Sequence, residues 1–156
     1  MIKICFVCLG NICRSPMAEF VFKKLVHDQG LEQYFTITSL GTSNEEYGNT
    51  IHPGTVKELK KHHIPYTMHY AKQLERDDYF KFDYFIGMDL SNVSSMKRLF
   101  SSDPLHKVYR FLDFTPLKRD IYDPWYPLDF ESTYNDIEMA SRYLLQYLLE
   151  KENGSF

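Results

Sequence analysis

Residues 2–16 read IKICFVCLGNICRSP, and this stretch decides the expected fold. Its first seven residues, Ile2–Cys8, are β-branched, aromatic or sulfur-containing with a single charge, which is typical of a strand buried on both faces of a parallel sheet. Gly10-Asn11 then breaks the strand. Ser15-Pro16 supplies an N-cap and a proline suited to the first turn of a helix. Apolar residues at helical spacing follow as far as Gly30, where we expect the helix to end.

Strand and helix patterns alternate along the rest of the chain. Runs rich in β-branched and aromatic residues predict further strands at residues 34–39, 82–88 and 107–111. Helical patterns predict a helix that Pro53 opens and that ends before Ile64, one capped by Ser91 that ends at Leu99, and a last one over residues 134–148. The alternation predicts an α/β fold with a four-stranded parallel sheet flanked by helices on both faces. Ligands of such sheets bind beyond the carboxyl ends of the strands.

Composition excludes several classes of protein. The chain has 156 residues, of which 44% are hydrophobic, so it is neither disordered nor fibrous. Its 18 basic and 21 acidic side chains give a net charge of −3, which favours neither a nucleic acid nor an anionic membrane as partner. The longest apolar run, residues 4–9, is too short to insert into a membrane. We therefore expect one domain, residues 1–156, in the cytoplasm.

The segment between Cys8 and Ser15 has the composition of an anion-binding loop. A turn between a strand end and a helix start can curl its backbone N–H groups around one anion, and the helix N-terminus adds a positive end. Such surroundings lower the pKa of a cysteine thiol to roughly 3.5–7.5, so Cys8 is the predicted nucleophile and Ser15 its hydrogen-bond partner. Arg14 offers a planar fork that matches two phosphate oxygens. The predicted phosphate-binding residues are Leu9, Gly10, Asn11, Ile12, Cys13, Arg14 and Ser15.

A nucleophile of this kind needs a proton donor for the leaving group. The best candidate is Asp123, in the long proline-containing loop over residues 111–129, because Trp125 and Tyr126 beside it offer aromatic surface for a phenol ring. On chain position alone, three other aspartates of the same loop remain alternatives: Asp113, Asp120 and Asp129.

Residues 7–19, VCLGNICRSPMAE, closely resemble the signature of the low-molecular-weight protein tyrosine phosphatases. FDY at 82–84, MDLSN at 88–92 and DPWY at 123–126 extend the resemblance over nearly the whole chain. The resemblance implies hydrolysis of phosphotyrosine in proteins and peptides through a phosphocysteine intermediate, with inorganic phosphate as product and without a metal or cofactor. It also implies that Cys8 is the nucleophile, that Arg14 is catalytic and that Asp123 is the general acid.

The resemblance assigns further roles. It implies that Asn11, Ser39 and His69 form a hydrogen-bond network that holds the loop, with Asp89 as further support. It implies a reversible disulfide between Cys8 and Cys13 that protects the nucleophile from oxidation. The expected walls of the substrate pocket are Leu9, Ile12, Tyr47, Trp125 and Tyr126. One departure is Pro127, where the family often has glycine, and this proline puts the position of the aromatic wall in doubt.

Three other functions are open to a chain of this kind. Arsenate reductases share the fold and the loop, but they need downstream cysteines to pass a disulfide along, and this chain has none after Cys13. Arginine phosphatases of the family carry threonine where this loop has Ile12, which favours an aryl ester here. A non-catalytic anion-binding module would not need the complete set of Cys8, Arg14 and Asp123.

Overall fold

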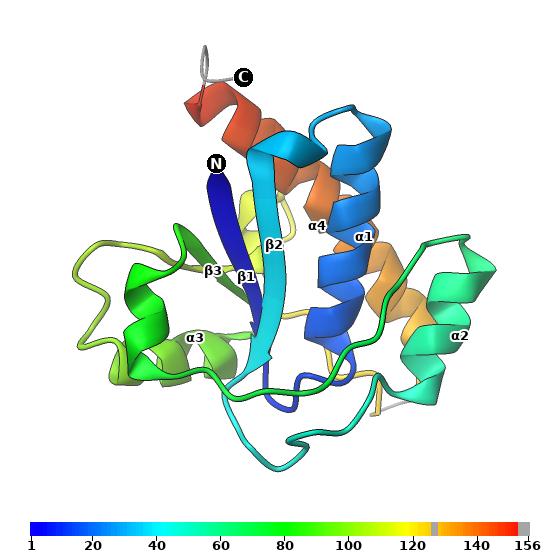
Figure 1. Cartoon of the computed structure of the whole chain (residues 1–156), viewed down its shortest axis with the longest axis horizontal. Helices are drawn as coiled ribbons and strands as arrows, with labels where there is room; N and C mark the ends of the chain where they lie inside the picture. Colours follow the sequence, from blue (N-terminus) through cyan, green and yellow to red (C-terminus); the bar gives the residue numbers. More distant parts are fainter. Residues whose placement is uncertain (126–127, 153–156) are drawn as a thin grey trace.

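The computed structural model describes residues 1–125 and 128–152, and it contains one parallel sheet. Its strands lie in the order β2-β1-β3-β4, and every neighbouring pair is parallel, as predicted (Figure 1). The bounds of the strands are β1 Ile2–Cys8, β2 Phe35–Gly41, β3 Tyr84–Gly87 and β4 Val108–Arg110. Tyr126 and Pro127 lie outside the described residues.

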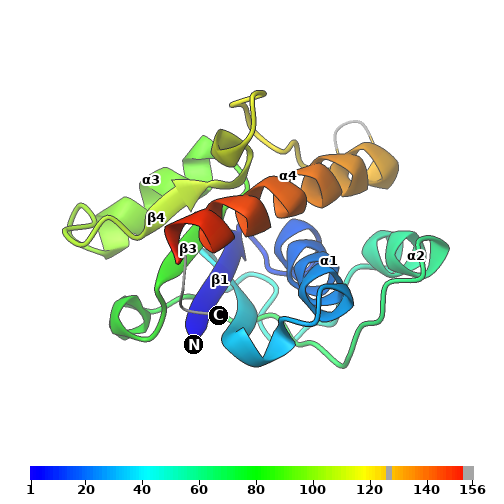
Figure 2. The same cartoon turned by 90° about the horizontal axis from the view of Figure 1, so that it is seen from above.

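Helices cover both faces of this sheet. Figures 1 and 2 show α3 on one side and α1, α2 and α4 on the other, with α4 running beside α1. The bounds are α1 Arg14–Asp28, α2 Pro53–Lys61, α3 Leu90–Leu99 and α4 Phe130–Lys151, with short 3₁₀ turns η1 Glu32–Tyr34, η2 Arg76–Phe80 and η3 Phe111–Phe114. No helix in the described part of the chain combines the length and the apolar character needed to span a bilayer.

Alternation along β1 divides the core between the two faces. Side chains two apart share a face of a strand, so Phe6 packs with Phe22 of α1 and Phe111 of η3. Cys5 belongs to a second cluster under α3, together with Phe85. Cys5 and Cys8 therefore point to opposite faces of the strand, and both thiols are free.

Two predicted helix caps are wrong. The first helix begins at Arg14 with Cys13 at the N-cap and no side-chain cap, because the Ser15 hydroxyl is bonded to other groups of the loop. The third helix is capped by Asp89, not Ser91: an Asp89 oxygen accepts from the N–H of Asn92 at 2.7 Å, and the Asn92 side chain bonds back. Both Asp89 and Ser91 are residue types that can cap a helix, and Asp89, two residues earlier in the chain, occupies the N-cap position of α3.

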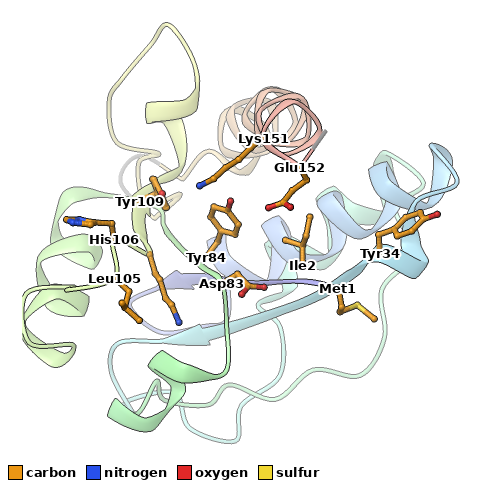
Figure 3. A pocket seen from close by; sticks show the side chains of 11 residues that line it. Met1, Ile2, Tyr34, Asp83, Tyr84, Leu105, His106, Tyr109, Lys151 and Glu152 are labelled. Carbon is orange, nitrogen blue, oxygen red and sulfur yellow. The ribbon is translucent and has the colours of Figure 1, made fainter. Parts of the chain in front are cut away.

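The predicted catalytic residues lie at the carboxyl ends of β1 and β3. Backbone hydrogen bonds join Met88 to Val7 at 3.1 Å and Ile121 to Met88 at 2.9 Å, so the long loop before α4 meets the loop after β1 at this edge. A pocket of about 490 Å³ lies at the opposite end of the strands, lined by residues such as Ile2, Tyr84 and Lys151 (Figure 3). It contains none of the predicted site residues.

Candidate active site

Cys8 ends β1 as a buried sulfur with two hydrogen-bonding neighbours. The Ser15 hydroxyl lies 3.0 Å from Sγ, and the backbone N–H of Asn11 donates to Sγ at 3.3 Å. Both contacts stabilise negative charge on sulfur more than they stabilise a neutral thiol, because hydrogen bonds to an ionised acceptor are stronger. The loop thus curls around the Cys8 sulfur, the atom for which the sequence predicts the role of nucleophile.

Asn11 holds the loop in its curled shape. Its φ of 60° lies in the left-handed region, which asparagine tolerates better than other residues with a side chain. The fully buried side chain donates from Nδ2 to the hydroxyls of Ser15 at 2.9 Å and Ser39 at 3.1 Å. Its Oδ1 accepts from the N–H of Lys72 at 3.1 Å. One side chain therefore ties the loop to β2 and to the segment around residue 72.

A buried carboxylate, Glu19, extends this network. The Ser39 hydroxyl donates to Glu19 Oε1 at 2.7 Å, and His69 Nε2 lies 3.0 Å from the backbone oxygen of Asn11. His69 Nδ1 is also 3.9 Å from Glu19 Oε1. Sequence reasoning assigned no role to Glu19, although an acidic residue one turn after Ser15 on a helix face that is otherwise apolar is a usable signal.

Arg14 is held rigidly at the floor of the site. Arg14 as a whole residue is only 5% exposed. Its Nη1 donates to Asp89 Oδ2 at 2.8 Å and to the backbone oxygen of Ile121 at 2.7 Å. Among the described residues, neither Nε nor Nη2 has a protein acceptor. The remaining edge of its fork is therefore free to bind an anion, while Asp89 and Ile121 hold Nη1.

The backbone of the loop is rich in unused donors. In residues 1–125 and 128–152, the N–H groups of Leu9, Gly10, Ile12 and Cys13 donate to no protein acceptor, while the carbonyl of Ile12 accepts from the N–H of His52 at 2.9 Å. Unsatisfied N–H groups next to a helix N-terminus form an anion site. The positive end of α1 points at the same place.

These groups open into a cleft of about 190 Å³. Its lining is Cys8, Leu9, Gly10, Ile12, Cys13, Arg14, Glu45, Glu46, Asp123 and Trp125. Asp123 is the one aspartate of its loop in this lining, which separates it from the three alternatives. Asp113 and Asp120 bind Arg110, and Asp129 caps α4, where hydrogen bonds from Ser132 hold its pKa below the usual range.

The walls agree with the sequence only in part. Leu9, Ile12 and Trp125 line the cleft, whereas Tyr47 is 71% exposed and is not in the lining. The loop that holds Tyr47 contributes Glu45 and Glu46 to the lining instead. Sequence reasoning missed both glutamates because residues 43–49 match the family pattern poorly. The remaining predicted wall residue, Tyr126, lies outside the described part of the chain. No metal-binding group of three His, Cys, Asp or Glu side chains is found among the described residues.

The family model for low molecular weight phosphotyrosine protein phosphatases matches residues 3–154. The chain belongs to this family. A low molecular weight protein-tyrosine-phosphatase PtpA of Staphylococcus epidermidis is 36% identical over 98% of this chain and 97% of its own length. This membership confirms the phosphoric monoester hydrolase activity predicted from the loop.

Solved structures confirm the fold of this phosphatase. Bacillus subtilis YfkJ is 35% identical with a TM-score of 0.92, over 98% of this chain and 97% of that one. The low molecular weight protein tyrosine phosphatase SP-PTP of Streptococcus pyogenes is 42% identical with a TM-score of 0.87, over 97% and 96%. A Drosophila arginine phosphatase is 27% identical with a TM-score of 0.86, over 94% and 98%.

Cys13 lines the same phosphatase cleft as Cys8. Burial and the adjacent Cys8 raise the pKa of the Cys13 thiol to about 12, so Cys13 stays protonated at neutral pH.

Trp125, in the lining of the same cleft, packs against His52, and the two rings are T-shaped with their centroids 4.4 Å apart. Nδ1 of His52 also caps α2, because it accepts from the N–H of Gly54 at 2.9 Å. The aromatic wall is therefore attached to the helix that follows the Glu45 loop.

Proposed function

We propose that this chain hydrolyses phosphotyrosine in proteins and peptides through a phosphocysteine intermediate. The observation that carries the proposal is the buried Cys8 sulfur beneath the free N–H groups of its loop, with Arg14 beside it and Asp123 on the same cleft. Residues 1–156 would act as one phosphatase domain, and the phosphate would be held by residues 9–15.

In the first step, the Cys8 thiolate attacks phosphorus in line with the leaving group. The S–P bond forms as the bond from phosphorus to the phenolic oxygen breaks, and the carboxylic acid of Asp123 gives its proton to that oxygen. Arg14 and the loop N–H groups stabilise the charge on the three equatorial oxygens. Tyrosine leaves neutral, and phosphate remains bound to sulfur.

In the second step, the Asp123 carboxylate removes a proton from water as the water oxygen attacks phosphorus. The S–P bond breaks and inorganic phosphate leaves, which restores the Cys8 thiolate. The Ser15 hydroxyl at 3.0 Å from Sγ stabilises the departing thiolate. The buried Asn11, Ser39 and Glu19 network keeps the loop in place through both steps, with His69 bound to its backbone.

Two features favour a phosphorylated phenol over phosphoarginine. Ile12 is an apolar wall of the cleft, and Trp125 adds an aromatic side chain to the lining. Arginine phosphatases of the family carry threonine where this loop has Ile12. An aryl ester therefore fits the cleft better than a guanidinium does.

Side-by-side hydrolysis of phosphopeptides tests the proposal. We expect release of inorganic phosphate from a phosphotyrosine peptide, in the presence of a chelator, and far slower release from phosphoserine and phosphoarginine peptides of the same sequence. Preferential release from phosphoarginine would instead establish the arginine-directed alternative, and release from none of the three would contradict a phosphatase function.

Cys13 is proposed as the redox partner of Cys8. Peroxide would convert the Cys8 thiolate to a sulfenic acid, and the Cys13 sulfur would then displace water to form a disulfide that thiols can reduce. Because the pKa of Cys13 is about 12, its thiolate fraction grows as pH rises, so disulfide formation should become faster from pH 7 to pH 9. A reducing cytoplasm would return the enzyme to its active form.

The disulfide is tested by mass spectrometry of peroxide-treated protein. We expect a peptide in which Cys8 is linked to Cys13, and recovery of activity on addition of dithiothreitol. In a Cys13→Ala variant, the same treatment should give oxidised Cys8 with little recovery. Absence of the linked peptide in the unmodified protein, or equal recovery in both proteins, would remove Cys13 from this role.

A further inference from the structure

The mouth of the cleft carries two carboxylates that the proposed chemistry does not use. Glu45, which is exposed, and Glu46, which is half-buried, line the cleft together with Asp123. No salt bridge to either glutamate is present among residues 1–125 and 128–152. We call Glu45 and Glu46 the acidic rim.

The acidic rim is fixed to the phosphate loop. The N–H groups of Thr42 and Ser43 donate to the carbonyls of Cys8 and Leu9 at 2.9 and 3.0 Å. Figure 1 shows this segment, which follows β2, passing along the loop that follows β1. The rim loop therefore starts on the backbone of the catalytic loop itself.

Local bonds then hold the backbone of this loop at Glu45 and orient the carboxylate of Glu46. The N–H of Glu45 donates to the Ser43 hydroxyl at 3.0 Å, and Asn49 Nδ2 donates to Glu46 Oε2 at 2.6 Å. The absence of a side chain at Gly10 leaves room for Glu46, whose Cγ would lie only 3.3 Å from a Cβ built there. Glu46 is thus pressed against the catalytic loop, with Glu45 beside it in the cleft lining.

Independent observations show that this cleft is built for a ligand. Arg14 lies in the same lining, is more than nine-tenths buried, and keeps Nε and Nη2 without a protein acceptor in the described part of the chain. Charge is therefore separated along the cleft: the floor is positive, for phosphate, and the mouth is negative. When the phosphate is seated on the floor, the peptide on either side of the tyrosine must lie at the mouth.

We propose that Glu45 and Glu46 select phosphotyrosine segments with lysine or arginine next to the phosphotyrosine and disfavour segments with acidic neighbours. This inference rests on the proposed phosphotyrosine phosphatase function. A basic neighbour forms an ion pair at the rim, while an acidic neighbour meets two like charges. The positive floor does not offset this repulsion, because the phosphate occupies it.

The test compares kcat/KM for three phosphotyrosine peptides that differ only in having lysine, glutamine or glutamate on both sides of the phosphotyrosine. Exposed ion pairs are weak singly, so at low ionic strength we expect kcat/KM of the lysine peptide to exceed that of the glutamate peptide by about tenfold. This ratio should shrink in 0.5 M salt, where the Debye length is only roughly 3–5 Å and the charges are screened. In the Glu45→Gln/Glu46→Gln variant the ratio should fall to about twofold.

A matched control separates the rim from net charge. The Glu32→Gln/Glu150→Gln variant removes the same two charges from exposed positions outside the cleft lining, and it should keep the ratio of the unmodified protein. Replacing both rim glutamates with lysine should reverse the preference. An unchanged ratio in the glutamine variant of the rim, or an equal fall in the control, would overturn the inference. Failure to hydrolyse all three peptides would instead contradict the proposed function.

Discussion

Replacement of Cys8 with serine is expected to abolish turnover of a phosphotyrosine peptide. The hydroxyl is far less acidic than a thiol, so the loop cannot hold it as an anion, and loss of a covalent nucleophile commonly costs several orders of magnitude. We expect kcat to fall by at least about 10⁴-fold, by analogy with other enzymes that lose their nucleophile. Phosphate release, measured with excess enzyme, quantifies the residual rate.

The matched control is Cys5→Ala, which changes the other cysteine of the same strand. Cys5 is fully buried under α3, on the opposite face of β1 from Cys8, so its loss should affect stability more than kcat. Circular dichroism and retained binding of vanadate would show that Cys8→Ser is folded with an intact loop. Normal turnover by Cys8→Ser would exclude Cys8 as nucleophile.

Replacement of Asp123 with asparagine is expected to lower kcat by about 10²–10⁴-fold, the usual contribution of a general acid. Asparagine keeps the shape of the side chain and an oxygen for the N–H of Trp125, which Asp123 Oδ1 binds at 3.1 Å, but it has no acidic proton to give. The loss should be largest for phosphotyrosine and smaller for an aryl phosphate whose phenol is more acidic. Steady-state kinetics over a series of leaving groups measures this dependence.

The control for this variant is Asp113→Asn in the same loop. Asp113 is exposed and binds Arg110 outside the cleft, so its neutralisation should leave kcat nearly unchanged. If Asp113→Asn lost as much activity as Asp123→Asn, or if the loss at Asp123 did not depend on the leaving group, Asp123 would not be the general acid.

Most of the fold follows from patterns that are local in sequence. The run over β1 has one charge in seven residues, and its neighbour strands alternate with helical patterns, which leaves few arrangements other than a parallel sheet. Exact helix starts could not be predicted in the same way. Ser15 and Ser91 are both good caps by composition. The Ser15 hydroxyl instead contacts Cys8, and Asp89 caps α3 through a local capping box with Asn92.

The site residues that are close together in sequence could be predicted from local patterns, whereas those that come from distant segments could not be predicted from such patterns alone. Cys8, Arg14 and the loop between them are neighbours in sequence, so the strand–loop–helix pattern brings them together without further information. The neighbouring aromatic residues favour Asp123 as the general acid, but Asp113, Asp120 and Asp129 share its loop. Only the resemblance to the family or the structure separates Asp123 from these alternatives. Glu45 and Glu46 reach the cleft because the segment after β2 forms backbone hydrogen bonds with the loop after β1. No periodicity in the sequence encodes such bonds.

The two hydrogen bonds of Arg14 Nη1 affect how the binding energy of the substrate is used. One nitrogen joins the floor of the cleft to the start of α3, through Asp89, and to the backbone two residues before Asp123, through Ile121. Contacts within the protein therefore hold three distant parts of the chain together. Such preorganisation leaves little rearrangement for an incoming phosphate to drive, so its binding energy is available to stabilise the transition state.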